Sequence, residues 1–216
     1  MIIAIDGPAA AGKGTLARRI AQSLGLPYLD TGLLYRAVGR RVLDAGGNPA
    51  DPIMATKAAE DLQEEDLDRS DLRGGPADKA ASQVASIPGV RAALLAFQRQ
   101  FGSRNGAVLD GRDIGTIIFP HADIKFFVTA SLEARTIRRH AELLARGETV
   151  PLDVVRADLA ARDDADAKRI AAPLKPARDA VMFDTSWLDA DAAFVEAMAL
   201  IDKRLNPGPR QGDLPA

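Results

Sequence analysis

Cysteine is absent from the 216-residue chain, which excludes disulfide bonds and thiolate metal sites. Its only histidines, His121 and His140, lack the spacing of metal ligands, and we expect both at ordinary surface or helix positions. No apolar run approaches the length of a membrane span, and the opening residues read as a strand and a glycine loop, so we expect no signal peptide. The sequence predicts a cytoplasmic protein without a membrane partner.

An excess of basic charge is also missing, because 28 lysines and arginines face 30 aspartates and glutamates, for a net charge of −2. Proteins that bind nucleic acid polymers usually carry a clear basic excess, so we expect no such partner. Any site for a polyanion must therefore be a local arginine cluster. The length suits one α/β domain with small inserts, and we expect a monomer.

A glycine-rich loop follows the first apolar run. It leads into an amphipathic helix with Leu16, Ile20 and Leu24 on one face. Strand, loop and helix in this order form the phosphate cradle of P-loop nucleotide enzymes: the backbone N–H groups point at phosphate oxygens, and the lysine supplies a mobile charge. The predicted ATP-binding residues are Gly7, Pro8, Ala9, Ala10, Ala11, Gly12, Lys13, Gly14 and Thr15.

This loop departs from the general P-loop motif at one position. The motif places Ser or Thr directly after the lysine, where it can bind magnesium, but Gly14 stands there and Thr15 comes next. The Gly-Lys-Gly-Thr variant is the one that nucleoside monophosphate kinases use.

Apolar runs alternate with helical patterns along the rest of the chain, which predicts an α/β fold with a central parallel sheet flanked by helices. With the glycine loop ahead of them, the expected fold is that of a P-loop kinase. The runs are 2–5, 107–109, 124–128 and 180–183, and the helical patterns include 31–43, 90–101, 131–146, 152–164 and 189–205. The acidic stretch 60–71 reads as a solvated surface within a small helical insert. We expect one domain over residues 1–205 and a flexible tail over 206–216.

Polar residues at strand ends are the next candidates. Asp110 directly follows an apolar run, and the carboxyl edge of a parallel sheet is where α/β proteins bind ligands, so Asp110 is a candidate to hold Mg²⁺ directly or through water. A simple turn with a local pair between Arg112 and Asp113 is the structural alternative for this loop. Thr31 can cap the helix that it opens, and Arg36, one turn further, could meet an anion at the same edge.

Helical spacing gives two groups of arginines a structural rather than a functional interpretation. Arg135, Arg138 and Arg139 share one helix, and periodicity places Arg135 and Arg139 opposite an apolar face, which favours a solvated surface over a phosphate clamp. That apolar face would consist of Ala134, Ile137, Ala141 and Leu144. Arg162, Asp166 and Arg169 have the spacing of a surface ion-pair ladder if one helix runs through all three.

Several segments together resemble bacterial cytidylate kinases, over residues 2 to about 185. They are Ile5-Asp6-Gly7-Pro8 through Gly12-Lys13-Gly14-Thr15; Leu29-Asp30-Thr31-Gly32 with Tyr35-Arg36; residues 81–85 with Pro88, Val90 and Arg91; Asp110-Gly111-Arg112-Asp113-Ile114-Gly115-Thr116; and Arg162-Asp163-Asp164 through Asp166, Arg169 and Ala172-Pro173-Leu174. The resemblance implies MgATP-dependent phosphorylation of CMP and dCMP. Two departures are Thr31, where many members have serine, and the short stretch 44–82, in which residues 64–76 are acidic and poor in β-formers.

The resemblance also implies roles for individual residues. Lys13 and the loop would bind the ATP phosphates, with Arg138 and Arg139 in a lid that closes over ATP. Lys13, Asp110, Arg112 and Arg139 are the catalytic candidates. The acceptor nucleotide would meet Thr31, Arg36, Arg112 and Arg169 at its phosphate, Ser82, Arg91 and Asp113 at the cytosine, and Arg162 and Asp166 at the ribose. The implied core is 1–44, 101–137 and 167–205, with an acceptor-binding insert over 45–100 and a lid over 138–166.

Two other functions remain open at this stage. One is a kinase of the same fold for AMP, UMP or a metabolite such as shikimate, and the other is a module that binds ATP and switches a protein partner. The trio Ser82, Arg91 and Asp113 suits cytosine, whose ring nitrogen and carbonyl accept hydrogen bonds while its amine donates one. Arginines placed for a second phosphate argue against a sensing module.

Overall fold

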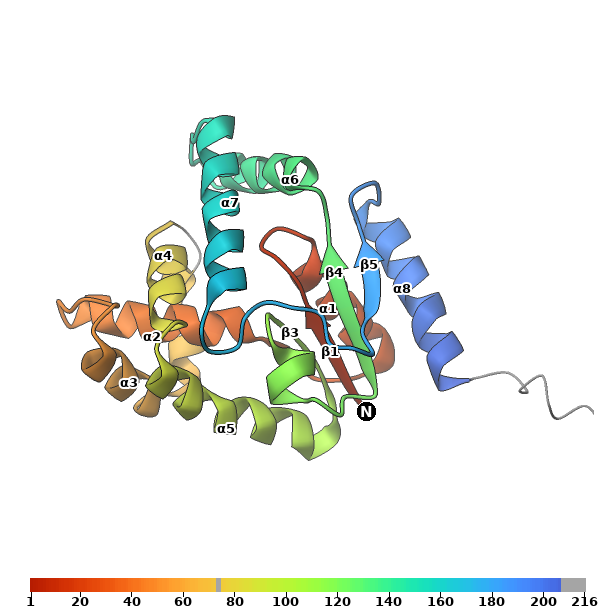
Figure 1. The fold of residues 1–216 in the computed structure, drawn as a ribbon, viewed down its shortest axis with the longest axis horizontal. Helices are drawn as coiled ribbons and strands as arrows, with labels where there is room; N and C mark the ends of the chain where they lie inside the picture. Colours follow the sequence, from red (N-terminus) through yellow and green to blue (C-terminus); the bar gives the residue numbers. More distant parts are fainter. Residues whose placement is uncertain (73–74, 207–216) are drawn as a thin grey trace, which may run out of the picture.

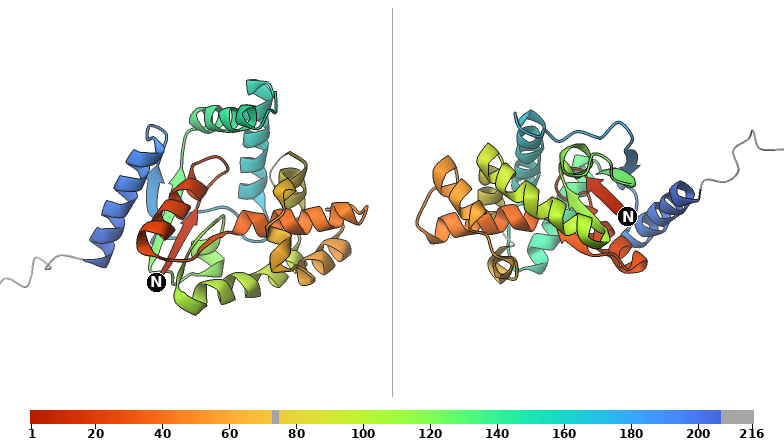
Figure 2. Two further views of the ribbon diagram at one scale, coloured as in Figure 1. Left: turned by 180° about the vertical axis from the view of Figure 1, so that it is seen from behind. Right: turned by 90° about the horizontal axis from the view of Figure 1, so that it is seen from below.

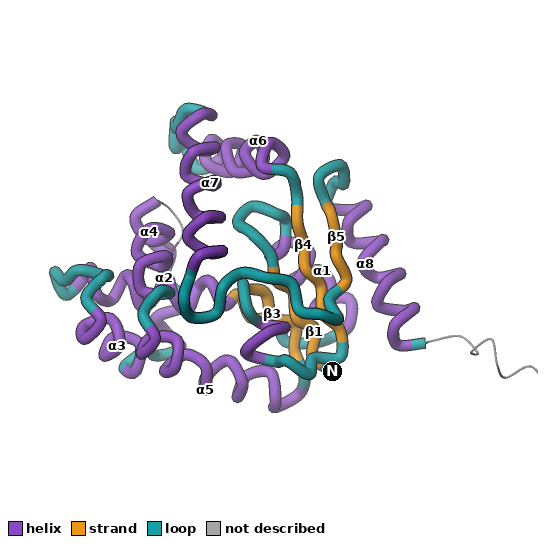
Figure 3. Tube along the Cα trace, in the orientation of Figure 1, coloured by secondary structure: helices purple, strands orange, loops and turns teal. Residues whose placement is uncertain are grey.

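The computed structural model describes residues 1–72 and 75–206, so the predicted tail lies outside the described residues from 207 onward. The predicted α/β class is confirmed (Figures 1 and 3). In chain order the elements are β1 (Ile2–Asp6), α1 (Lys13–Leu24), β2 (Tyr28–Asp30), α2 (Thr31–Asp44), α3 (Pro52–Glu60), short turns at Glu64–Leu67 and Ser70–Leu72, α4 (Gly75–Val84), α5 (Pro88–Asn105), β3 (Ala107–Gly111), a π-helical turn (Ile114–Ile118), β4 (Ile124–Thr129), α6 (Leu132–Ala145), α7 (Leu152–Lys168), β5 (Val181–Asp184) and α8 (Ala190–Leu205).

The sheet has five parallel strands in the order β2-β3-β1-β4-β5. The four predicted apolar runs become β1, β3, β4 and β5. The fifth strand, β2, has three residues, and the sequence marked only its end at Asp30. Register places Asp30 opposite Asp110 and Ile5 opposite Asp110, so the ends of β2, β3 and β1 lie at one edge of the sheet.

Helices cover both faces of the sheet. On one face α1 and α8 pack on Ile5, Phe126 and Phe183 through an apolar cluster that includes Ile20 and Ile201. Figure 2 shows these two helices on the side turned toward the viewer in its left view. On the other face α2, α3 and α5 form a second cluster with the opposite sides of β1 and β3. The central strands β1 and β3 are buried on both faces, as parallel strands in α/β proteins are, whereas Met182 of the edge strand β5 is 59% exposed.

The segment between α2 and β3 is helical and packs on α2. Gly39 of α2 makes this contact close, because a Cβ at this position would lie 2.7 Å from the Cβ of Ala80 in α4. The predicted solvated acidic stretch is partly paired with basic residues instead. Arg41 of α2 binds Asp66 at 2.6 Å, and Arg69 binds Asp71 at 2.8 Å.

Helices α6 and α7 form a pair above the loop that follows β1 (Figure 1). They join that loop through an apolar cluster of Ala9, Leu143, Val155 and Leu159. The predicted orientation of α6 is wrong. Ile137 and Leu144, expected to face the core, are 57% and 49% exposed, whereas Arg135 is only 5% exposed. Ion pairs with α7 and contacts with the glycine loop determine which face of α6 turns inward. The periodicity of the α6 sequence carries no information on these contacts.

Within the described ranges, no single helix is long and apolar enough to span a membrane. One bent pair, Pro76–Val84 with Pro88–Asn105, passes a test of length and composition only, with a bend of 98° between them.

Candidate active site

The glycine loop between β1 and α1 encloses its own lysine. Gly7 approaches β4 so closely that a Cβ would lie 1.9 Å from the carbonyl oxygen of Val128, which leaves room for glycine alone. The Lys13 ammonium is buried and donates a hydrogen bond to the carbonyl of Pro8 at 2.7 Å. Burial lowers the pKa of Lys13, and Arg112 adds to that effect, while Asp110 opposes it. A bound phosphate would favour the charged ammonium.

Two carboxylates lie next to this lysine at the ends of neighbouring strands. Asp30 ends β2, and Asp110 lies opposite it in β3, where it accepts a hydrogen bond from the Tyr28 hydroxyl at 2.8 Å. Burial raises the pKa of Asp110, and the negative charge of Asp30 raises it further. A cation would relieve this repulsion, and carboxylate oxygens are the ligands that Mg²⁺ prefers, so the pair fits the ion. Among residues 1–72 and 75–206, no group of three or more metal-ligating side chains gathers.

The loop after β3 is fastened to β1 by a carboxylate that sequence reasoning did not assign. Asp6 accepts hydrogen bonds from the backbone N–H groups of Ile114 and Gly115, each at 2.8 Å. Burial raises the pKa of Asp6 to about 6, although the two backbone hydrogen bonds oppose the change. Asp6 thereby fixes the loop that carries Arg112 and Asp113. A carboxylate at the end of β1, directly before the glycine loop, was the signal available in the sequence.

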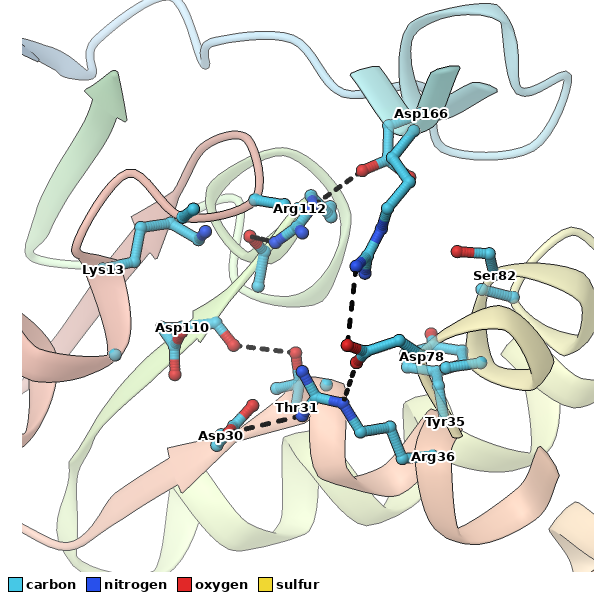
Figure 4. A pocket seen from close by; sticks show the side chains of 18 of the residues that line it. Lys13, Asp30, Thr31, Tyr35, Arg36, Asp78, Ser82, Asp110, Arg112 and Asp166 are labelled. Atoms are coloured by element: carbon cyan, nitrogen blue, oxygen red, sulfur yellow. Dashed lines mark hydrogen bonds and ion pairs between the residues drawn. The ribbon is translucent and has the colours of Figure 1, made fainter. Parts of the chain in front are cut away.

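A cavity of about 230 Å³ lies beside these strand ends (Figure 4). Every residue predicted for the acceptor nucleotide lines it, although these residues come from four helices (α2, α4, α5 and α7), the residue that follows α7, and the loop after β3. The set is Thr31, Arg36, Ser82, Arg91, Arg112, Asp113, Arg162, Asp166 and Arg169, together with the catalytic candidates Lys13, Asp110 and Arg139. Residues separated by up to 156 positions in sequence thus meet in one cavity.

The cavity's arginines are paired with its own carboxylates. Arg91 and Asp113, the two residues predicted to read the base, bind each other. Arg112 binds Asp166 at 2.8 Å, and Arg169 binds the other oxygen of the same carboxylate. The surface ladder expected for Arg162, Asp166 and Arg169 is therefore wrong. Helix α7 carries the first two into the cavity, and Arg169 directly follows its end.

The predicted capping role of Thr31 is also wrong. Helix α2 begins at Thr31 itself, and its N-cap residue is Asp30. The buried Thr31 hydroxyl instead donates to the carbonyl oxygen of Asp110 at 2.8 Å. This bond fastens the start of α2 to the end of β3, so the acceptor-side residues of α2 keep a fixed position relative to Asp110.

A second cavity of about 360 Å³ lies on the other side of the glycine loop. Ala10, Ala11, Gly12, Thr15 and Arg138 of the predicted ATP set line it, whereas Gly7 and Pro8 line neither cavity. Arg138 donates to the hydroxyl of Thr185 and to the carbonyl of Leu188, each at 3.1 Å, and so connects α6 to the loop after β5.

The two cavities meet at a common wall. Ala10 of the glycine loop and Arg139 and Glu142 of α6 line both of them. Arg139 also binds Glu142 at 2.9 Å. Two ligands bound at once, one in each cavity, would therefore face each other across Arg139. Lys13 and Asp110 line the first cavity together with this arginine.

Four polar side chains that line the first cavity were not predicted from the sequence: Asp30, Tyr35, Asp78 and Glu142. The sequence held a signal for three of them. Tyr35 and Asp30 flank predicted site residues directly, and Glu142 lies one helical turn beyond Arg139. Asp78 lies one turn before Ser82 on the same helix, but nothing in the sequence pairs it with a cation.

Comparison with known proteins shows the family of this chain. The sequence model of the family described as cytidylate kinase matches residues 3–203. The chain belongs to the cytidylate kinase family. The cytidylate kinase of Acidiphilium cryptum is 62% identical over 208 residues, which cover 96% of this chain and 98% of that protein. The cytidylate kinase of Granulibacter bethesdensis is 59% identical over 204 residues, 94% of this chain and 98% of that protein.

Solved structures support the fold of this cytidylate kinase family member. A gluconokinase from Sinorhizobium meliloti superposes with a TM-score of 0.54 at 16% identity, covering 95% of this chain and 94% of that one. An uncharacterized protein from Eubacterium ventriosum gives a TM-score of 0.55 at 14% identity, covering 94% and 98%. At these identities the likeness concerns the fold alone.

Proposed function

We propose that this chain transfers the terminal phosphoryl group of ATP to CMP or dCMP, forming ADP and CDP or dCDP. The observation that carries the proposal is the pair of cavities that meet at Ala10, Arg139 and Glu142, one beside the glycine loop and one lined by the base-reading pair. Membership of the cytidylate kinase family favours this reaction over the metabolite kinase and the sensing module.

ATP binds along the glycine loop in this proposal, with its base in the second cavity near Arg138. The backbone N–H groups and the N-terminus of α1 bind the phosphates, and Lys13 leaves the Pro8 carbonyl to contact them. Arg139 lines both cavities, so it lies between the two nucleotides, where negative charge develops as the phosphoryl group is transferred. Such fixed cations accelerate phosphoryl transfer by stabilising the transition state more than the bound substrates.

CMP occupies the first cavity. Arg36, Arg112 and Arg169 hold its phosphate, with the Thr31 hydroxyl beside them. Arg91 donates to the ring nitrogen and carbonyl of cytosine, while Asp113 accepts from the exocyclic amine and Ser82 lines the same pocket. Arg162 and Asp166 lie toward the ribose. The pairing of Arg91 with Asp113 before binding keeps both buried charges compensated.

Mg²⁺ bound with ATP would neutralise charge on the phosphates, and Asp110, with Asp30 beside it, would hold it directly or through water. We further propose that residues 45–100 form the acceptor-binding insert and residues 138–166 the lid, which excludes water from the transfer. A cytoplasmic location and a monomeric state stay predictions.

A coupled assay of ADP release tests the function. MgATP is offered with CMP, dCMP, UMP, AMP and GMP in turn. We expect turnover with CMP and dCMP and little with the other three. No turnover with any acceptor, despite measurable ATP binding, would contradict the proposal.

The Lys13→Ala variant is the matched test of the glycine loop. Its turnover should fall by several orders of magnitude, because the mobile cation for the transferred phosphoryl group is lost. A near-normal rate would contradict the role of Lys13. Circular dichroism of the variant would check that it retains the fold.

A further inference from the structure

Asp78 of α4 is the carboxylate around which the first cavity's cations gather. Its Oδ1 binds Nε of Arg36 at 2.9 Å, and its Oδ2 binds Nη2 of Arg139 at 2.6 Å and Nη1 of Arg162 at 3.8 Å. The three guanidinium groups come from α2, α6 and α7. Figure 4 shows the carboxylate of Asp78 directly beside the guanidinium of Arg36, with a dashed line joining the two. One buried side chain therefore joins the segment 45–100 to the proposed lid.

This arrangement resembles the binding of a phosphate by arginines. A phosphate is recognised by several guanidinium groups converging from different elements. Asp78 presents two acceptor oxygens to three such groups and is 8% exposed. Burial alone would raise the pKa of Asp78, but the attraction of Arg36, Arg162 and Arg139 outweighs it and holds the pKa below its usual value. The carboxylate is therefore charged at neutral pH.

The position of Asp78 is set by rigid packing. Gly39 allows α4 to lie against α2, with Ala80 at the contact, and this places Asp78 beside Arg36 on the facing helix. The other carboxylates of the cavity that bind its arginines have proposed contacts with the nucleotide or the metal, or lie at the exposed rim as Glu142 does. Asp78 has no such contact, and it holds an arginine that the acceptor phosphate needs.

We propose that Asp78 is a built-in competitor of the acceptor's phosphate group: its carboxylate occupies Arg36 and connects α4 to α6 and α7 until the phosphate displaces it. This inference rests on the proposed function for its ligand, since the phosphate meant is that of the acceptor nucleotide. The empty site is thereby neutralised, and its arginines do not repel one another. The presence of Asp78 lowers the affinity for the acceptor nucleotide, because its carboxylate stays close to the negatively charged phosphate group and repels it.

Binding of CMP, of cytidine and of inorganic phosphate to Asp78→Asn, measured by isothermal titration, tests the proposal. Asparagine keeps the size of the side chain and removes its charge. We expect CMP to bind about fivefold or more tightly than to the wild type, the scale of a typical coupling between two ligands. Cytidine, which lacks the phosphate, should bind with unchanged affinity. Inorganic phosphate should bind more tightly as well.

Asp78→Ala repeats the test without any acceptor for the guanidinium groups. Its melting temperature should fall in the empty state, because three partly buried cations lose their partner. The rise in melting temperature on adding CMP should exceed that of the wild type. Equal or weaker CMP binding by both variants would overturn the proposal, since Asp78 would then only hold the arginines in place. A gain for cytidine equal to that for CMP would overturn it too.

Asp44→Asn is the matched control. Asp44 also accepts from two arginines, Arg40 at 2.8 Å and Arg69 at 2.7 Å, but it does not line the cavity. Its CMP affinity should equal that of the wild type. The phosphate titration keeps the proposal separate from the function: if the wild type binds no CMP, the proposed function fails, yet phosphate still reports whether Asp78 competes for the arginines.

Discussion

At the scale of single residues, the proposed base specificity depends on Asp113. It is buried, paired with Arg91, and held in place by the loop that Asp6 fastens. Cytosine presents an amine to a carboxylate at this position, whereas uracil presents a carbonyl. A buried acceptor facing another acceptor is unpaired, and the cost of that mismatch separates the two nucleotides.

The substitution Asp113→Ala should therefore relax the choice between CMP and UMP. The unpaired group costs about 1–3 kcal/mol, so we expect the ratio of kcat/KM for CMP over UMP to fall by about 5- to 150-fold. Steady-state kinetics with both acceptors measures the ratio. An unchanged ratio would show that another residue reads the amine.

Asp6 gives a prediction on pH. Its pKa is raised from 3.8 to about 6 in the folded chain, so the folded state binds the proton more tightly than the unfolded state. The stability that this group contributes is thus fully present below about pH 3.8 and is lost as the pH rises through about 6. Asp6→Asn has no such titration. It also leaves one of the two N–H donors unpaired, because the amide has a single acceptor oxygen.

Urea unfolding of the wild type and of Asp6→Asn at pH 5, 6 and 7 measures the effect. The stability of the wild type relative to Asp6→Asn should increase as the pH falls from 7 to 5, by about 1.3 kcal/mol for a pKa raised from 3.8 to about 6. The difference between the two proteins cancels the titration of all other groups. A difference independent of pH would contradict the raised pKa.

At the scale of elements, one ion pair holds α6 and α7 together in addition to their apolar cluster. The guanidinium of Arg135 binds both oxygens of Asp163, at 3.0 and 2.6 Å, and donates to the carbonyl of Ala9 in the glycine loop at 3.3 Å. The pair thus joins the two helices to the glycine loop, the proposed ATP site. Removing the carboxylate leaves a buried cation without its main partner.

Asp163→Asn should loosen this closure and admit water to the bound ATP. We expect the rate of ADP formation without any acceptor to rise relative to the rate with CMP, and the melting temperature to fall. The neighbouring Asp164→Asn is the control, because Asp164 is exposed and binds only Lys168 at 2.8 Å within the described residues. Equal ratios of hydrolysis to transfer in the two variants would contradict a closing role.

At the scale of the whole molecule, the two cavities share a wall on α6, so binding in one should affect the other. Arg139 contacts both spaces and is held by Asp78 and Glu142 when they are empty. The first ligand that releases Arg139 spends part of its binding energy on breaking these pairs. The second ligand then meets a guanidinium that is already free.

We therefore expect ADP and CMP to bind cooperatively. The affinity for CMP in the presence of saturating ADP should exceed that of the free protein by at least about fivefold. Titration calorimetry with and without ADP measures the factor. Independent binding of the two nucleotides by the wild type would contradict coupling through Arg139. If the wild type binds them cooperatively, the Arg139→Ala variant should bind them independently.

Much of the site could be predicted because its residues follow local rules. The glycine loop, Asp110 and Thr31 all lie where a strand ends, and parallel strands end at one edge of a sheet. The resemblance supplied Ser82, Arg91 and the α7 residues, which no local rule singles out. Periodicity failed on α6, where it assumed that apolar Ile137 and Leu144 face inward. The inward face there carries Arg135, whose partner Asp163 lies on the next helix.

The sequence by itself determined the α/β class, the nucleotide loop and the set of cationic residues, because these depend on short-range patterns of apolar, glycine and charged residues. Only the tertiary structure decided how the charges combine: Arg36, Arg139 and Arg162 on Asp78, Arg112 and Arg169 on Asp166, and Arg91 on Asp113. Most of these pairs join different elements, in one case 61 positions apart. Their energy comes from helix packing that brings opposite charges together in a space with little water, and no local pattern encodes it.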